Sequence, residues 1–356
     1  MVFITIFHLP KTNIKVTLKH KTMHSGKRFS AVEFIVWTKR SIYVLLILAL
    51  IPTLLYYFGF TFLSFPWQPI AIMGTAVAFI VGFKNNASYS RLWEARQIYG
   101  AIINDSRSFG YVLRDSLSGK NQVKVKAMFE RHYAWLTALR FQLREPRAWE
   151  MMNISQFKEY AKKYEIQERT FKIEDELKKY LAEDELKYIL SKKNRATQLM
   201  ALQSKELAEA YAKGEINDFQ WSQINQQLVK FTDDQGKAER IKNFPYPRNF
   251  SSITTYLLIL FIVFVPFGLV KEFAKMGEGT VLENYTLWFN VPFSLLVTWC
   301  FHTLDSVGEA SVNPFEGSPN DVPITQISRT IEIDMRDMLD ETNLPPAITP
   351  KNNIVL

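Results

Sequence analysis

The sequence lacks the motifs that mark a catalyst or a disulfide-stabilised domain. Its single cysteine, Cys300, has no partner within the chain, which excludes an intrachain disulfide framework. The five histidines are scattered without the spacing of metal ligands, and no glycine-rich phosphate-binding loop occurs. The sequence therefore predicts a protein that is not an enzyme and that holds no metal or cofactor.

Charge is absent from three long stretches of the chain. Residues 41–83, 249–270 and 284–304 contain no Asp, Glu, Lys or Arg. A membrane-spanning helix needs about 20 apolar residues. The first stretch is long enough for two such helices and each later stretch for one, so the sequence predicts four transmembrane helices. The alternative for the first stretch is a hairpin buried in a soluble core.

The first stretch is expected to reverse direction near "FGFTFLSFPWQP", residues 58–69. Gly59, Pro66 and Pro69 interrupt the apolar run there. Proline has no backbone N–H to donate, so a turn at the membrane surface is a suitable place for it. The aromatic residues of this segment are also favoured at the membrane interface.

The distribution of positive charge predicts the orientation. Residues 1–40 carry eight lysines and arginines against one glutamate: Lys11, Lys15, Lys19, Lys21, Lys27, Arg28, Lys39 and Arg40 against Glu33. The segment 271–285 carries two lysines and three glutamates. By the positive-inside rule, both termini and the long middle segment are expected on the cytoplasmic side of the cell inner membrane. The formal net charge of +8 then reflects this bias, and no nucleic-acid partner is expected.

The segment between the second and third spans is expected to be helical, so the predicted fold class is all-α. "KIEDELKKYLAEDELKYIL", residues 172–190, repeats apolar residues at intervals of three and four, which indicates one amphipathic helix that we extend over 171–213. Thr325 is a candidate N-cap for a last helix. The expected divisions are an arm (1–40, with 1–22 of open status), helices one and two (41–90), a helical cytosolic domain (91–248), helices three and four (249–305) and a C-terminal segment (306–356).

The second span has two distinct faces. Thr75, Phe79 and Phe83 recur every four residues and share one face. Small side chains form another face: Ala71, Gly74, Ala78 and Gly82. Small residues allow close helix packing, whereas rings arranged around an axis would form a hydrophobic constriction that gates by dewetting. From the spacing alone, rings that face lipid or the helix bundle remain the alternative.

Four stretches together resemble the bestrophin family, specifically its bacterial branch. They are "GFKNNASYSRLWEARQIYGAIINDSRSF" (82–109), "ALRFQLRE" (138–145), "FPYPRNF" (244–250) and "NPFEGSPNDVPI" (313–324). The resemblance covers residues 27–340 in the family's order. It implies a homopentameric ion channel in the lipid bilayer, with one axial pore, four membrane helices per subunit and a helical cytosolic domain.

The resemblance also implies roles for particular residues. The narrow neck of the pore would be lined by Thr75, Phe79 and Phe83, and a second, cytosolic aperture by Phe244. The segment Lys84–Asn85–Asn86 would lie where the neck widens into the cytosolic vestibule. The loop that clasps calcium in animal bestrophins keeps only two acidic residues here, Glu316 and Asp321, and calcium prefers six to eight oxygen ligands, so no calcium site is expected.

The expected function is passive conduction of monovalent anions such as chloride. Phenyl rings have positive edges that favour a partly dehydrated anion, and the inner side of the membrane segments is basic. Conduction of monovalent cations is the first alternative, because uncharged rings repel neither sign. A membrane-anchored scaffold or a transporter is the second, although neither Pro266 nor Pro292 is accompanied by an apparent internal charge pair. His302 and Asp305 are a further candidate, as ionisable groups near the end of the fourth span.

Overall fold

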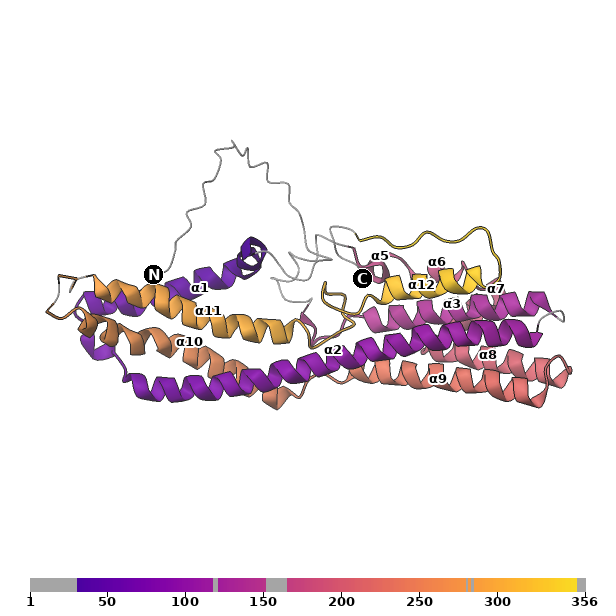
Figure 1. The fold of residues 1–356 in the computed structure, drawn as a ribbon, viewed down its shortest axis with the longest axis horizontal. Helices are drawn as coiled ribbons and strands as arrows, with labels where there is room; N and C mark the ends of the chain where they lie inside the picture. The colour runs from indigo at the N-terminus through magenta and orange to yellow at the C-terminus, as the bar shows by residue number, and fades with distance from the viewer. Residues whose placement is uncertain (1–30, 118–120, 152–164, 280, 283–284, 351–356) are drawn as a thin grey trace, which may run out of the picture.

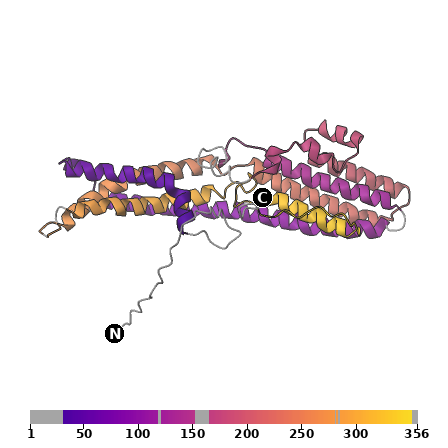
Figure 2. The ribbon, with the colours of Figure 1, turned by 90° about the horizontal axis from the view of Figure 1, so that it is seen from above.

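The computed structural model describes residues 31–117, 121–151, 165–279, 281–282 and 285–350, and the regular secondary structure of these residues is helical. Of the expected arm of residues 1–40, residues 1–30 lie outside these ranges and residues 31–40 belong to the first helix. The described segments form one elongated molecule, with long apolar helices toward one end and a bundle of more polar helices toward the other (Figures 1 and 2). The prediction of an all-α fold is confirmed for these residues.

Four helices are long and apolar enough to cross a membrane, as predicted. They are α1 (Ala31–Tyr57), α2 (Trp67–Leu117), α10 (Arg248–Met276) and α11 (Asn290–Glu309). Pro266 lies inside α10 without ending it, and Pro292 falls in the first turn of α11, where a missing N–H costs little. Neither proline therefore breaks a membrane helix.

The predicted reversal between the first two spans is also confirmed. Gly59 has a φ of +92°, in the left-handed region that favours glycine. A single turn of 3₁₀-helix, η1 (Thr61–Leu63), follows, and α2 begins at Trp67, directly after Pro66. Pro69 lies in the first turn of α2, where its fixed φ suits helix initiation.

The helix α2 continues without interruption from the membrane part into the second half of the molecule, where a bundle of helices packs along it (Figure 1). Its partners there are α9 (Asp218–Asn243), α12 (Ile324–Asp337) and α3 (Gln122–Arg144). A further helix, α8 (Arg195–Ala212), packs against α3 and α9. These helices enclose one apolar core. Aromatic rings from α2, α3 and α9 meet at its centre, with Phe231 5.0 Å from Trp135 and 5.7 Å from Phe109 between ring centroids.

The single helix predicted over 171–213 is wrong. The structure has the short helices α5 (Gln167–Thr170), α6 (Ile173–Leu177) and α7 (Glu183–Leu190), and then α8. The apolar face was nevertheless correct, because Leu177, Leu181, Leu186 and Ile189 are all buried.

Local signals explain the two breaks. Ala182 is extended, and the three acidic residues that follow it lie in the first turn of α7, where the helix dipole favours them. Asn194 caps α8 by accepting a hydrogen bond from the Thr197 N–H at 3.0 Å.

The prediction that Thr325 caps the last helix is wrong. Because α12 already begins after Pro323, Thr325 lies inside it, and its hydroxyl donates to Glu168 at 2.6 Å.

The face of small residues on α2 is only partly used for packing within the subunit. Gly74 is buried against α10, and a Cβ at this position would lie 2.7 Å from the Phe261 ring. Ala78 and Gly82 are exposed instead. The close helix contact predicted from the sequence thus occurs at Gly74 and not along the whole face.

Candidate pore and its supporting contacts

One face of α2 exposes aromatic side chains in the isolated subunit. Phe79 and Phe83 are 67% and 59% exposed, and their rings meet edge to face with centroids 4.5 Å apart. Thr75, one turn earlier, is exposed as well, and its hydroxyl donates to the Ala71 carbonyl at 3.1 Å. The three residues singled out by periodicity therefore share one exposed face. The Thr75 hydroxyl donates its hydrogen bond to the backbone of its own helix.

The other side of α2 is occupied within the subunit. Ile70, Val77 and Val81 are buried in a cluster shared with α10. This leaves the strip that carries Phe79 and Phe83 as the part of α2 not covered by its own chain. A strip of large rings left uncovered on a membrane helix is available to lipid, to another subunit or to a pore.

The three polar residues that follow Phe83 do not point in one direction. Lys84 is buried, with 1% of its side chain exposed, and its Nζ lies 2.8 Å from Asp305 Oδ1 and also contacts Glu309. The Asn85 amide donates to the Leu304 carbonyl of α11 at 3.0 Å, and Asn86 is exposed. The Lys84 side chain is thus turned into the subunit, since its charge needs partners at the edge of the membrane segment.

The helix α11 holds this part of α2 closely. A Cβ on Gly308 would lie 2.0 Å from the Asn85 side-chain oxygen, so a larger residue there would displace the Asn85 side chain that donates to Leu304. Lys84 and Asp305 form an ion pair between α2 and α11 that the sequence analysis did not predict. Asp305 and Glu309 are four residues apart, which places both carboxylates on one face of α11. That spacing was the signal in the sequence that could have identified them as partners of Lys84.

His302 and Asp305 do not act as a pair. His302 Nε2 lies 2.7 Å from the Ser41 hydroxyl of α1, whereas Asp305 faces Lys84 on α2. The two side chains, three residues apart on α11, therefore connect this helix to two different neighbours. Their contacts are those of helix packing.

The proposed aperture residue, Phe244, is the residue at which α9 ends. Its side chain is exposed, and the prolines that follow it lead to the start of α10. Two residues earlier, Lys242 is buried and paired with Glu150. Phe244 therefore lies on a short connection whose preceding turn is held by a buried ion pair.

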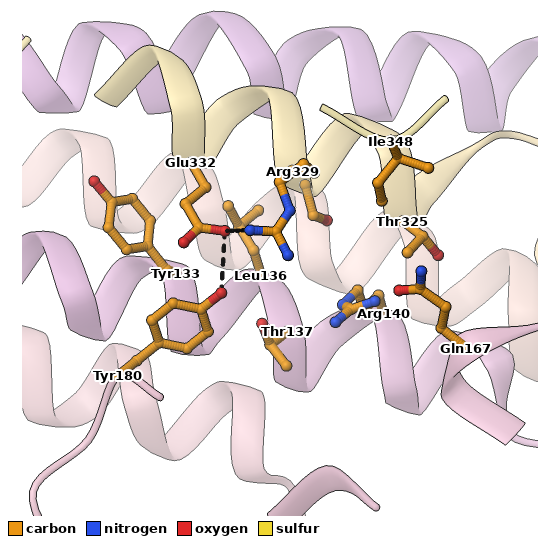
Figure 3. A pocket seen from close by; sticks show the side chains of 11 residues that line it. Tyr133, Leu136, Thr137, Arg140, Gln167, Tyr180, Thr325, Arg329, Glu332 and Ile348 are labelled. Carbon is orange, nitrogen blue, oxygen red and sulfur yellow. Dashed lines mark hydrogen bonds and ion pairs between the residues drawn. The ribbon is translucent and has the colours of Figure 1, made fainter. Parts of the chain in front are cut away.

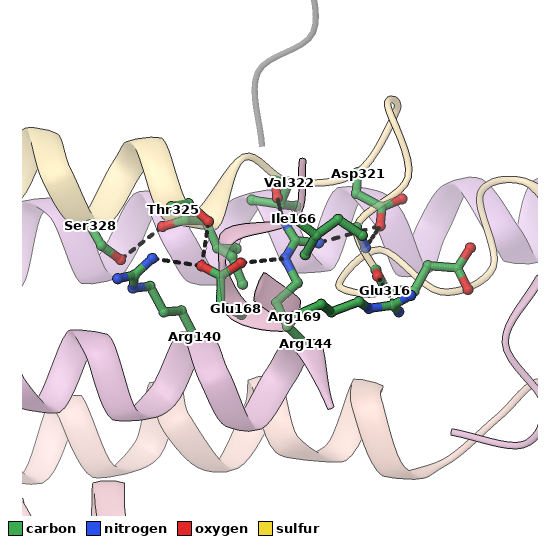
Figure 4. A network of polar contacts seen from close by, with 12 residues as sticks. Arg140, Arg144, Ile166, Glu168, Arg169, Glu316, Asp321, Val322, Thr325 and Ser328 are labelled. Atoms are coloured by element: carbon green, nitrogen blue, oxygen red, sulfur yellow. Dashed lines mark hydrogen bonds and ion pairs between the residues drawn. The ribbon is translucent and has the colours of Figure 1, made fainter. Parts of the chain in front are cut away.

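The loop between α11 and α12 belongs to a buried network of charged groups (Figure 4). Asp321 accepts hydrogen bonds from the backbone N–H groups of Gly317 and Ser318, at 2.8 and 2.9 Å, and from the Ser318 hydroxyl. Arg144 lies 3.7 Å from Asp321 and 3.9 Å from Glu168. The Asp321 carboxylate thus shapes its own loop, and the expectation that the loop holds no calcium stays a prediction.

Glu316, in the same loop, is a buried carboxyl group that forms no ion pair with the described residues. Its Oε2 accepts the Met151 N–H at 3.0 Å. Burial raises the pKa of Glu316 to about 8, and the negative charges of Asp321 and Glu150 add to this effect. Because this pKa lies above the ordinary value of 4.5, the group's contribution to stability is fully present below pH 4.5 and is lost as the pH rises through about 8.

Glu316→Gln is therefore expected to stabilise the protein at pH 9 by about 1–3 kcal/mol and to have little effect at pH 5. The glutamine resembles the protonated carboxyl group and retains an acceptor for Met151. Thermal unfolding of both proteins at the two pH values measures the difference. Glu145→Gln, at an exposed carboxylate, is the control, and an equal effect of Glu316→Gln at both pH values would contradict the assignment.

A groove between α3 and α12 is lined by polar groups that pair with one another (Figure 3). Glu332 accepts hydrogen bonds from the Tyr180 hydroxyl at 3.0 Å and from Arg329 at 2.9 Å. Ile348, from the segment after α12, lines the same groove. Among the residues that the structure describes, no group of three or more His, Cys, Asp or Glu side chains is placed to hold a metal ion.

Four spans, an uncovered aromatic strip and a second span that extends into a helical domain define a class of integral membrane protein with an attached helical bundle. The chain belongs to the bacterial and fungal bestrophin family, which matches residues 30–337. This confirms the resemblance that the four sequence stretches indicated. It also supports a channel-forming protein and not an enzyme.

Curated relatives and solved structures agree with this assignment. The chain is 26% identical over 295 residues to the voltage-dependent anion channel-forming protein YneE of Escherichia coli K12, covering 83% of this chain and 84% of that protein. It is 25% identical over 276 residues to the voltage-dependent anion channel-forming protein RSc3414 of Ralstonia nicotianae, covering 78% of each. A crystal structure of a bacterial bestrophin homologue from Klebsiella pneumoniae superposes with a TM-score of 0.69 at 22% identity, covering 85% of this chain and 98% of that one. The structural likeness supports the fold.

Proposed function

We propose that the chain forms a homopentameric channel that conducts monovalent anions such as chloride through one axial pore. The observation that carries this proposal is the uncovered strip on α2, where Phe79 and Phe83 are exposed although the opposite face of the same membrane segment is packed against α10. Five such strips around an axis would form a narrow apolar neck with Thr75 at one end. The homopentamer itself is expected from the family resemblance.

The preference for anions rests on two arguments. The edge of a phenyl ring is positive, so rings that present their edges to the axis favour a partly dehydrated anion. The relatives in Escherichia coli and Ralstonia are named as anion channel-forming proteins. Phe244, exposed at the end of α9, is proposed to form the cytosolic aperture, and Asn86 to lie at the inner end of the neck.

The orientation follows the charge distribution. We assign both termini and the helical bundle to the cytoplasmic side of the inner membrane, because residues 1–40 carry the excess of lysine and arginine. The bundle would then surround the inner vestibule of the channel.

A specific observation keeps cation conduction as the second candidate. Lys84, the first cationic residue after the rings, is matched by two carboxylates, so it supplies no free positive charge to the pore. The expectation that a basic inner side attracts anions is weakened at this position.

Current through the purified protein in a planar bilayer under a KCl gradient tests the proposal. Reversal near the equilibrium potential of chloride is expected. Reversal near the equilibrium potential of potassium would establish the cation channel instead. An intact oligomer that passes no current would contradict both and favour a scaffold.

A further inference from the structure

The charged cluster directly behind the neck contains more negative than positive charge. Lys84 follows Phe83 in the sequence, and its Nζ contacts the carboxylates of both Asp305 and Glu309. With all three groups ionised, the cluster carries one surplus negative charge in each subunit. Glu309 is the more accessible of the two carboxylates, with 27% of its side chain exposed against 14% for Asp305.

Among the residues that the structure describes, no second lysine or arginine forms an ion pair with either carboxylate. The next cation along α2, Arg91, lies two turns further on and donates its hydrogen bonds to the backbone carbonyls of Val312 and Ile241, at 2.9 Å each. On α11, His302 contacts the Ser41 hydroxyl of α1. The cluster is mostly buried, and counterions in solution screen buried charges much less than exposed ones.

We propose that Lys84, Asp305 and Glu309 set the charge selectivity of the neck. Glu309 supplies a negative electrostatic potential at the inner end of the neck, and Lys84 reduces that potential. This inference rests on the proposed pore along α2. A symmetric oligomer repeats the cluster around the axis, so the potential acts on every ion that leaves the rings. The aromatic rings and this cluster then favour ions of opposite sign.

The two substitutions are expected to shift the permeability ratio of potassium to chloride in opposite directions. Lys84→Met removes the only cation and leaves two carboxylates, so the permeability ratio of potassium to chloride should increase. Glu309→Gln leaves the balanced pair of Lys84 and Asp305, so the same ratio should decrease. One unit charge about 10–15 Å from the axis, at an effective dielectric constant of about 20, changes ion occupancy by roughly tenfold. We therefore expect each variant to shift the ratio by about threefold or more.

A purely structural role for the cluster predicts a different pattern. If it only fastens α2 to α11, both substitutions loosen the same contact and shift the reversal potential in the same direction, or leave it unchanged. The sign of the two shifts thus separates charge selectivity from helix packing. Lys84→Arg retains the charge and should keep the ratio of the unmodified channel.

The measurement is the reversal potential in a planar bilayer under a KCl gradient, after the oligomer has been verified by size-exclusion chromatography. Arg107→Met is the matched control, because it removes a cation from α2 at an exposed pair with Asp334, about 35 Å further along the helix. It should leave the ratio unchanged.

Shifts of opposite sign support the proposal, and shifts of the same sign, or none, overturn it. If Lys84→Met does not assemble, Glu309→Gln decides alone. A shift toward the chloride equilibrium potential supports the proposal, and no shift overturns it. The proposed function fails separately, when the unmodified oligomer passes no current.

Discussion

Replacing Phe79 by alanine is expected to increase the single-channel conductance several fold. The ring is the middle residue of the exposed strip on α2 and stacks edge to face on Phe83. In a narrow apolar neck, ions cross a barrier because water leaves the constriction, and a smaller side chain lowers that barrier by admitting water. If the barrier falls by about 1 kcal/mol, the conductance rises roughly fivefold. Single-channel recording in symmetric KCl measures the change.

The control is a phenylalanine exposed elsewhere in the membrane part. Phe293 lies on α11, contacts Phe273 of α10 and is half-exposed. Phe293→Ala should leave the conductance unchanged, because this ring lies off the strip on α2. Equal conductance of Phe79→Ala and the unmodified channel would place the rings away from the conduction path.

Replacing Phe231 by alanine is expected to have the largest effect on stability. The ring is fully buried at the centre of the bundle, 4.7 Å from the ring of His132 and 5.0 Å from that of Trp135. Burial lowers the pKa of His132 to about 3, so the imidazole is a neutral part of this core. Removing the phenyl group leaves a cavity that costs about 3–5 kcal/mol. The midpoint of thermal unfolding should fall by on the order of 10 °C.

The same helix provides a matched control. Phe219, also on α9, is 86% exposed, so Phe219→Ala removes the same group from a site with little packing. Its unfolding midpoint should remain close to that of the unmodified protein. A similar loss in both variants would indicate that the effect does not arise from the core, and a stable Phe231→Ala would contradict the packing described above. Thermal unfolding scans in detergent, followed by light scattering, measure the midpoint for the unmodified protein, Phe231→Ala and Phe219→Ala.

The membrane part was the most predictable from the sequence. Uncharged runs of fixed minimum length predict spans directly, and Gly59 with Pro66 marks the turn between the first two. The shared face of Thr75, Phe79 and Phe83 was predictable as well, because residues four apart lie on the same face of an α-helix. Its role as a neck rests on the resemblance and stays a prediction.

The sequence predictions were wrong or incomplete where packing between distant segments decides the structure, because a local sequence pattern does not contain that information. The apolar period over 171–213 continues across two breaks, because the buried leucines face the same core from separate short helices. The ion-pair partners of Lys84 were not predicted either, because they lie more than 200 residues later, on α11. Pairing across that separation is decided by tertiary packing.

The unbroken course of α2 has a mechanical consequence. Its 51 residues span about 77 Å as one helix, with Pro69 in the first turn as its only proline. A helix of this kind tilts or rotates as a unit, so a force applied where Arg107 meets Asp334 of α12 reaches the Phe83 ring without a joint in between. Anything that binds the far end of the bundle would therefore act on the width of the proposed neck through the stiffness of a single rod.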